Sequence, residues 1–117
     1  MTKGMRRGLN IEFRIWIYKG DVKLLGKGRV EILERIKRTG SILSASKEMK
    51  MSYRQAWQMV KEMNERAVSP LVEKKPGGKN GGGAVLTEAG EKAIVMFRKL
   101  EKRVEVFIKK NSERMEL

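Results

Sequence analysis

The stretch from Ser52 to Lys61 carries side chains that can bind DNA, at positions that suit a helix. Arg can donate two hydrogen bonds to guanine, and Gln can pair in the same way with adenine. Serine hydroxyls and helix N-termini suit phosphates. A helix that reads bases needs such side chains at the N-terminal end of its outer face. The candidates for contacts to bases or nearby phosphates are Ser52, Arg54, Gln55 and Gln58, and Tyr53 is counted with them among the DNA-binding residues.

A glycine-rich run, PGGKNGGG, begins at Pro76. It lacks the G-K-[ST] ending of a P-loop and the strand–helix setting of G-x-G-x-x-G, so it does not indicate nucleotide binding. Because glycine has no side chain, a glycine-rich hairpin tip can approach a phosphate backbone or a minor groove closely, as a wing does. A flexible loop without a ligand is the alternative. The candidates for contacts to the DNA backbone are Lys61, Lys74, Lys75, Lys79 and Asn80.

Tyr53 and Trp57 are four residues apart and therefore share one side of the same predicted helix. Such a pair can stack on single-stranded bases. Aromatic rings at this spacing more commonly pack at the edge of a core and orient the helix, and we favour that interpretation.

The composition narrows the functional classes. Lys and Arg number 27 against 14 Asp and Glu, and the net charge of +13 attracts polyanions, nucleic acid first and anionic lipid second. The chain has no Cys and no His, which excludes thiol catalysis, zinc fingers and imidazole acid–base chemistry. The carboxylates are scattered among basic neighbours, as in surface ion pairs. We therefore predict that the protein is not an enzyme and uses no cofactor or metal.

Two predicted helices position the candidate residues. Ser41 is a natural N-cap for the first, and Ser52 opens the second, which runs to about residue 66. The break between them, Lys50-Met51, is as tight as the turn of a helix-turn-helix. A further helix over 29–39 precedes them and ends at Gly40. The inner faces are predicted to carry Ile42, Ala45, Ser46 and Met49 in the first helix and Ala56, Val60 and Met63 in the second.

The remaining elements flank this pair. Residues 10–19 alternate between apolar and polar, which predicts a half-buried strand, and 23–28 are predicted to be a short connection. Two short strands, 71–75 and 84–86, form a hairpin around the glycine-rich run. Thr87 then caps a helix over 87–110 that is long for so small a domain.

The apolar residues of this long helix recur at heptad-like steps, which favours pairing with a second copy over packing in the core of the same chain. We predict a homodimer, to which the first strand also contributes. The predicted dimer contacts are Ile15, Ile17, Trp16, Ala93, Phe97, Leu100, Val104 and Phe107.

With 117 residues the chain is the size of one domain. We expect a disordered basic tail over 1–9, a domain over 10–110 and a frayed tail over 111–117. The fold class is α+β and mainly helical: a winged helix-turn-helix with an N-terminal strand, a wing hairpin and a long C-terminal helix. No stretch is long and apolar enough for a membrane span, and the basic N-terminus lacks the apolar core of a signal peptide. We therefore expect a cytoplasmic protein.

From about residue 40 to 90 the sequence carries a series of specific motifs, which identify a family more sharply than helix and strand periodicity do. The pieces are Met51-Ser52-Tyr53-Arg54 with Ala56-Trp57, Met63-Asn64, Leu71-Val72-Glu73, Gly77-Gly78-Lys79 and Gly81 to Thr87. This ordered series resembles the N-terminal DNA-binding domain of the ModE family, molybdate-responsive transcription regulators with a LysR-like winged helix-turn-helix. The similarity covers about residues 10–108.

The resemblance implies a domain that dimerises through its N-terminal strand and long C-terminal helix. It implies that the helix from Ser52 enters the major groove and that the loop at Lys79 is the wing. Asn80 interrupts what is a longer glycine run in relatives. Full-length relatives carry C-terminal molybdate-binding modules, and no segment up to Leu117 resembles one, so we expect a stand-alone version of the DNA-binding domain.

The expected function is regulation of transcription by a homodimer that binds double-stranded DNA, with molybdenum-related genes as candidate targets. One alternative is a nonspecific architectural protein of the nucleoid. Another is the DNA-binding subunit of a complex in which a separate protein senses an effector. Binding to an anionic membrane is the least favoured, because the Glu residues of the last helix oppose it.

Overall fold

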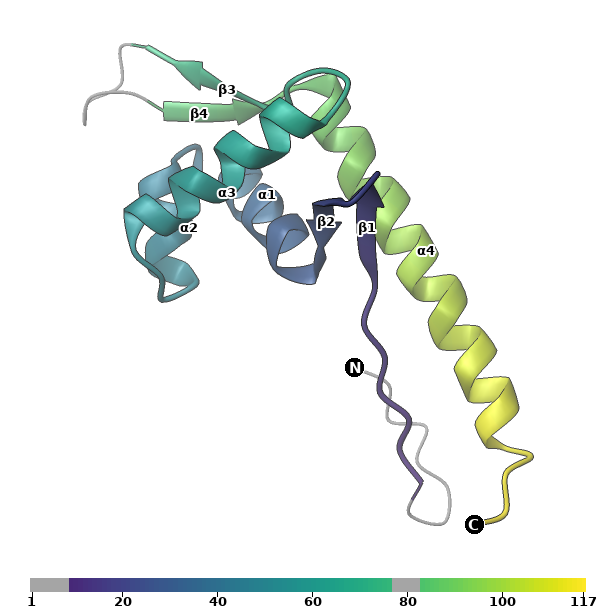
Figure 1. The fold of residues 1–117 in the computed structure, drawn as a ribbon. Coiled ribbons are helices and arrows are strands. Elements are labelled where there is room, and N and C mark those ends of the chain that lie inside the picture. Colours follow the sequence, from purple (N-terminus) through teal and green to yellow (C-terminus); the bar gives the residue numbers. More distant parts are fainter. Residues whose placement is uncertain (1–8, 77–82) are drawn as a thin grey trace.

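The computed structural model describes residues 9–76 and 83–117, and these form a winged helix-turn-helix, which confirms the predicted α+β fold (Figure 1). Antiparallel β1 and β2 come first, followed by the three helices α1, α2 and α3. The antiparallel wing strands β3 and β4 come next, and α4 ends the fold. The bounds are β1 Trp16–Lys19, β2 Val22–Gly26, α1 Lys27–Thr39, α2 Ile42–Glu48, α3 Tyr53–Arg66, β3 Val72–Lys75, β4 Gly83–Leu86 and α4 Glu88–Ser112.

Helix α1 lies at the centre of the core. Its apolar side chains are fully buried, and α2, α3 and the first half of α4 pack around them. The largest fully buried side chains are Phe97, Leu25, Ile32, Leu33, Ile36 and Met63. The inner faces predicted for α2 and α3 are largely confirmed, since only Met49 of those seven side chains remains partly exposed.

The helix boundaries follow the capping residues that the sequence indicated. The Ser41 hydroxyl accepts a hydrogen bond from the backbone N–H of Ser44 at 3.0 Å, and the Ser52 hydroxyl accepts one from Gln55 at 3.0 Å. Gly40 ends α1 with a φ of 74°, a left-handed conformation that glycine adopts without strain. The turn between α2 and α3 contains Lys50, whose φ of 56° is also left-handed.

The N-terminal region differs from the prediction. Residues 22–26 form the strand β2, where a connection was predicted, and β1 begins only at Trp16. The turn is at Gly20, with a φ of 64°. Leu24 and Leu25 pack on the core, so the short run between Gly20 and Gly26 is long enough to pair with β1.

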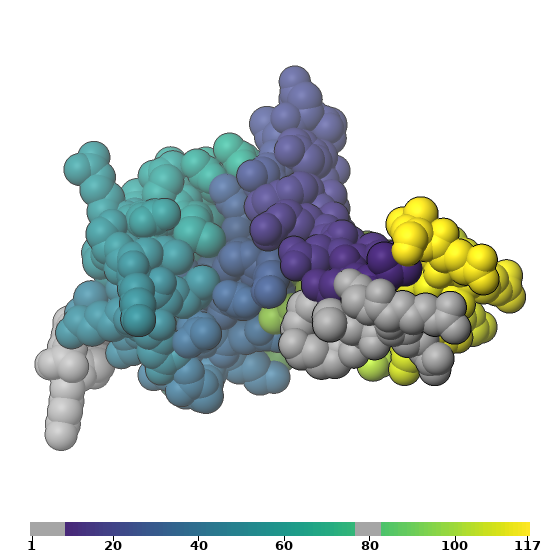
Figure 2. Space-filling view, turned by 90° about the horizontal axis from the view of Figure 1, so that it is seen from below, coloured from purple at the N-terminus to yellow at the C-terminus, as the bar shows by residue number. Residues whose placement is uncertain are grey.

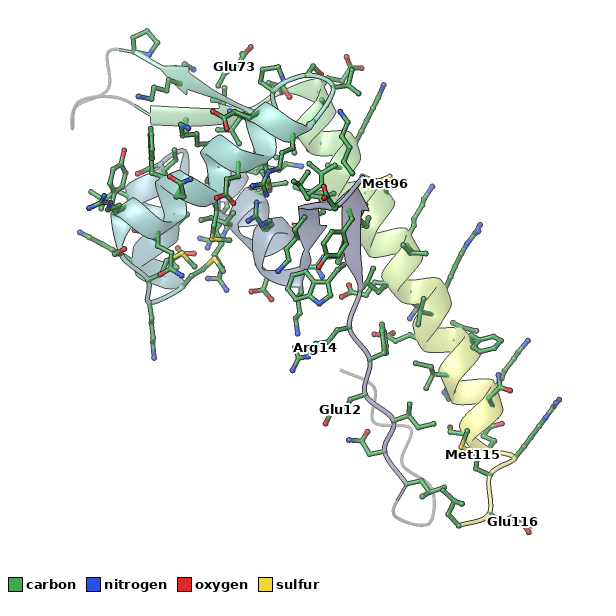
Figure 3. All side chains as sticks on the ribbon, viewed as in Figure 1. Glu12, Arg14, Glu73, Met96, Met115 and Glu116 are labelled. Atoms are coloured by element: carbon green, nitrogen blue, oxygen red, sulfur yellow. The ribbon has the colours of Figure 1, made fainter. Side chains whose placement is uncertain are left out.

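Residues 10–15, here called the arm, are extended but lie outside any ladder of the described residues. Their exposure alternates as predicted: Glu12 and Arg14 point away from α4 in Figure 3, and the odd-numbered residues are half-buried. Figures 1 and 2 show the arm running beside the C-terminal part of the chain and away from α2 and α3.

The second half of α4 projects from the domain (Figure 1). The chain measures 58 × 29 × 21 Å with a radius of gyration of 17.0 Å, whereas a compact domain of this length would have about 13 Å. The helix continues two residues beyond Lys110, so the tail starts at Glu113 and not at 111. Of the helices in 9–76 and 83–117, none has the length and apolar character needed to cross a membrane.

The wing is attached to α1 as well as to α4. The ladder pairs Val72 with Leu86 and Lys75 with Gly83. The backbone N–H of Ala84 donates to the Gly40 carbonyl at 2.9 Å. A Cβ at Gly83 would lie 2.8 Å from that carbonyl oxygen, so only glycine permits this approach. The same bend therefore ends α1 and fixes the base of the wing.

Candidate nucleic-acid interface

Helix α3 has two faces of opposite character. Ala56, Val60 and Met63 are buried against the core. The other face is open to solvent and carries all of the candidates predicted for this helix and its cap: Ser52, Tyr53, Arg54, Gln55, Gln58 and Lys61. The structure thus brings these six together on one exposed surface, here called the α3 face. That they touch DNA stays a prediction.

The N-terminal end of the α3 face is the part best prepared for a ligand. Within the residues that the structure describes, the side chains of Arg54 and Gln55 form no hydrogen bond or ion pair. Ser52 is the N-cap, and its oxygen is already used to accept from Gln55, but a hydroxyl can still donate its hydrogen. Arg54 and Gln55 can therefore bind base edges without first giving up an internal partner.

Gln58, in contrast, is held by an internal network. Its amide Nε2 donates to Oε2 of Glu62 at 3.1 Å. The other carboxylate oxygen of Glu62 accepts from Nη2 of Arg29 at 2.6 Å and lies 3.6 Å from Nη1 of Arg66. An α1 side chain therefore restricts where Gln58 lies on the α3 face.

The same network places two arginine side chains beside the Glu62 carboxylate, which lies close to the predicted DNA surface. The hydrogen bond from Arg29, followed by that from Gln58, holds the pKa of Glu62 below its ordinary value, although partial burial opposes this. Glu62 therefore stays ionised, and the positive charges of Arg29 and Arg66 offset its repulsion of phosphates.

Lys61 forms an exposed ion pair, with its Nζ 2.9 Å from Oε2 of Glu65 one helical turn away. Exposed pairs of this kind contribute well under ~1 kcal/mol. Lys61 can therefore leave Glu65 for a phosphate at little cost.

The two aromatic residues of α3 differ in their surroundings. Trp57 is half-buried and packs against the core, as favoured above. Tyr53 is 47% exposed at the N-terminal end of the helix. Tyr53 therefore belongs to the α3 face, and Trp57 helps to set the position of the helix.

The wing supplies exposed basic residues. Lys74 and Lys75 lie on β3, paired with Ala84 and Gly83 of β4. Their strand partners have small side chains, so the lysine stems are not covered from β4. Glu73 is exposed on the same strand (Figure 3). The other two wing candidates, Lys79 and Asn80, lie outside the described residues.

The predicted dimer contacts do not lie on one surface. Ala93 and Phe97 are buried in the core of their own chain, Phe97 at 1% exposure, so their assignment to a dimer interface is wrong. The heptad-like pattern misled because α4 packs on α1 with its first half. Ile15 and Ile17 also pack partly on the core. Trp16, Leu100 and Phe107 are exposed, and Val104 is half-buried.

Trp16 is exposed and yet has a fixed position. Its ring lies over Gly26, where a Cβ would be 2.3 Å from ring carbons. Lys23 covers the ring, with its Nζ 3.8 Å from the ring centroid, a favourable cation–π contact. The ring is therefore held between β2 and the Lys23 side chain, with about half of its side chain still exposed.

Glu62 and Arg29, which organise the α3 face, were not predicted from the sequence. The spacing of four between Gln58 and Glu62 was visible in the sequence and indicates a helical side-chain pair. Arg29 is on another helix, 33 residues from its partner, and no local pattern indicates that contact.

Comparisons with known proteins agree with the helix-turn-helix fold. The model of bacterial regulatory helix-turn-helix proteins of the lysR family matches residues 28–91, more than half of the chain. Molybdenum-pterin-binding protein MopB of Rhodobacter capsulatus is 49% identical over 66% of this chain and 28% of its own length. Molybdenum transport protein ModE of Azotobacter vinelandii is 40% identical, over 78% and 34% respectively.

Transcriptional regulator ModE of Haemophilus influenzae is 36% identical over 82% of this chain and 38% of that protein. The chain thus spans about a third of the length of these relatives. The resemblance to the DNA-binding part of ModE proteins is confirmed, and the family consists of transcription regulators and not of enzymes. The family match runs from α1 to the start of α4. Together with the fold and these relatives, it shows that the chain belongs to the lysR family of bacterial regulatory helix-turn-helix proteins.

Proposed function

We propose that this protein is a site-specific transcription regulator that binds duplex DNA as a homodimer, with α3 in the major groove. The observation that carries the proposal is the α3 face itself. It presents Arg54 and Gln55 at the N-terminal end of an exposed helix face whose other side is anchored in the core. A recognition helix needs this division between a buried and a polar side.

The wing supports the same orientation. In Figure 1 the wing strands extend from the start of α4 toward the side of the domain on which the N-terminal half of α3 lies. Lys74 and Lys75 can therefore contact the DNA backbone while α3 reads bases. With a net charge of +13, such contacts attract DNA of any sequence and make the affinity depend on salt.

The homodimer is supported by apolar surface that the single chain leaves uncovered. Met96, Leu100 and Phe107 are exposed on α4 at spacings of four and seven, which places them on one stripe of the helix. The arm offers an extended backbone without a ladder partner among the described residues. Two-fold pairing through this stripe and the arms would place two α3 helices about 34–36 Å apart, or at a multiple of that distance.

The target genes are proposed from the relatives. Three of them are named for molybdenum transport, molybdenum-pterin binding or the regulator ModE. We infer that this protein controls molybdenum-related genes and acts in the cytoplasm, where bacterial DNA is. A separate effector-sensing protein is the proposed route by which molybdate would act.

Selection of bound fragments from the source genome tests the proposal. At about 0.2 M salt nonspecific phosphate binding is weakened, so enrichment reports sequence preference. We expect a sequence with two-fold symmetry to be enriched. The selection is repeated with molybdate and with cell extract, and an effect that needs the extract would support a separate sensor.

The alternatives predict other outcomes. An architectural protein would enrich no sequence, and its binding would fade by about 10³–10⁵-fold between 50 and 200 mM salt if it touched six to ten phosphates. Enrichment that appears only in the presence of a co-purifying protein would indicate a DNA-binding subunit. Enrichment of a single, asymmetric site would contradict the homodimer.

A further inference from the structure

Asn64 connects the reading helix to the wing. It lies in the last turn of α3, and its side chain is turned away from the α3 face toward the first residues of the wing. Its Oδ1 accepts from the backbone N–H of Leu71 at 2.8 Å and from that of Val72 at 3.1 Å. Its Nδ2 donates to the Val72 carbonyl at 2.9 Å. Three of the four hydrogen bonds that a carboxamide can form therefore go to two adjacent residues.

Leu71 and the preceding Pro70 are held from the side of α4. The Leu71 carbonyl accepts from the backbone N–H of Thr87 at 3.0 Å. A Cβ at Gly90 would lie 2.3 Å from that carbonyl oxygen, so α4 approaches it as closely as glycine permits. The Thr87 hydroxyl donates to the Pro70 carbonyl at 2.7 Å. The segment over 70–72 is thus clamped between the end of α3 and the start of α4.

The clamped segment leads directly into the first strand of the wing. Val72 begins β3, and Lys75 follows three residues later, about 10 Å further along an extended strand. A rotation of about 20° at Val72 would move Lys75 by about 3 Å, which is enough to break a contact to a phosphate. The direction of β3 at Val72, together with the Ala84–Gly40 hydrogen bond at the base of β4, therefore sets where the wing lysines lie relative to the α3 face.

We propose that Asn64 is a positioning residue for DNA binding, whose carboxamide fixes the angle between the reading helix and the basic wing. The proposal rests on the proposed function, since it assumes that α3 and the wing contact one duplex. Asn64 itself does not touch DNA. It acts through Lys74 and Lys75, which it keeps at the distance from α3 that the phosphate backbone requires.

The test is a double-mutant cycle. Binding to one duplex is measured over a series of salt concentrations for wild type, Asn64→Ala, Lys74→Ala/Lys75→Ala and the triple variant. We expect Asn64→Ala to lower the salt slope by up to about 1.8, the value for two lost phosphate contacts. Adding Asn64→Ala to the lysine variant should change the affinity by less than about twofold, because the wing contacts are already gone.

A purely structural role of Asn64 would give a different result. Asn64→Ala would then lower the melting temperature, while the folded fraction would bind with the wild-type salt slope, and the losses from Asn64 and the lysines would multiply. A wild-type salt slope for Asn64→Ala, or losses that multiply, would overturn the proposal. Asn111→Ala is the matched control, because the bond that the Asn111 amide forms among the described residues goes to the Phe107 carbonyl, within α4, at 2.8 Å. It should leave the salt slope unchanged.

If Asn64→Ala does not fold, Asn64→Asp gives the same information. It keeps the acceptor for Leu71 and Val72 and replaces the Nδ2 donor by an oxygen facing the Val72 carbonyl. We expect a slope between those of wild type and the lysine variant, and the wild-type slope would overturn the proposal. A failure of the proposed function is seen separately, as the lack of a preferred sequence. The slopes remain comparable on any duplex, because phosphate contacts carry no sequence information.

Discussion

Arg98 of α4 and Glu34 of α1 form a forked ion pair, with Nε 3.0 Å from Oε2 and Nη2 2.7 Å from Oε1. Nη1 of Arg98 also donates to Glu101 at 2.7 Å. The two carboxylates, Glu34 first, raise the pKa of the Arg98 guanidinium above its ordinary range. The pair ties the projecting helix to the centre of the helix-turn-helix. In a dimer it would help to set the spacing of the two α3 helices.

Replacing Arg98 by Lys should lower the free energy of unfolding by about 0.5–1 kcal/mol. Lysine keeps the charge but cannot form the fork, and the partial exposure of both side chains limits the effect. Urea denaturation measures it. Lys92→Arg is the control, because the pair of Lys92 with Glu88 is exposed and 3.8 Å long. A loss as large in the control as in Arg98→Lys would contradict the role of the fork.

The Glu62 network predicts a pH dependence. The pKa of Glu62 is lowered on folding, so its stabilisation is complete above the unfolded pKa, which is near 4.5. It is lost as the pH falls through the folded pKa. The difference in free energy of unfolding between wild type and Glu62→Gln should therefore be constant above about pH 5.5 and shrink below pH 4.5. Denaturation between pH 3 and 7 measures it, and a difference that grows on acidification would refute this account.

The turn between α2 and α3 contains a strained residue. Lys50 adopts a φ of 56°, which costs a residue with a Cβ about 1–2 kcal/mol. Lys50→Gly should therefore stabilise the fold by about 0.5–1 kcal/mol. Lys47→Gly, three residues earlier in α2, is the matched control and should destabilise it by about 1 kcal/mol. Thermal unfolding distinguishes the two, and a lower melting temperature for both would show that Lys50 is not strained.

The proposed homodimer would form through the exposed stripe on α4. Phe107 is 66% exposed, and Phe107→Glu should yield monomers in sedimentation experiments without lowering the stability of the domain. The two charges would face each other across a two-fold axis. Val68→Glu is the control, because Val68 is 96% exposed in the loop between α3 and β3. A Phe107→Glu protein that remains dimeric would exclude the stripe as the interface.

Local sequence features predicted most of this fold. The capping residues Ser41, Ser52 and Thr87 and the glycine at 40 marked the helix ends, because those signals act within one turn of the chain. The α3 face followed from helical periodicity. The role of Phe97 did not, because a heptad-like pattern does not distinguish packing on α1 from packing on a second copy.

The contacts that orient the α3 face and the wing could not be predicted from local sequence patterns either. Arg29 reaches Glu62 across 33 residues, and Asn64 reaches the backbone of Leu71 and Val72 around a reversal of the chain. Such contacts depend on how helices pack, and the residue types alone carry no mark of the partner. β2 was missed for a similar reason, since its pairing with β1 accompanies the burial of Leu25 in the core.

Methylation protection on a selected DNA fragment tests the central claim most directly. If the α3 helices of a homodimer read bases, guanine N7 atoms in the major groove should be protected in two segments about 34–36 Å apart, or at a multiple of that spacing. Arg54→Ala should cost about 1–3 kcal/mol of binding free energy and remove protection at one position in each segment. Guanine N7 atoms that stay reactive throughout the bound fragment, with Arg54→Ala weakening all sequences equally, would contradict site-specific reading by α3.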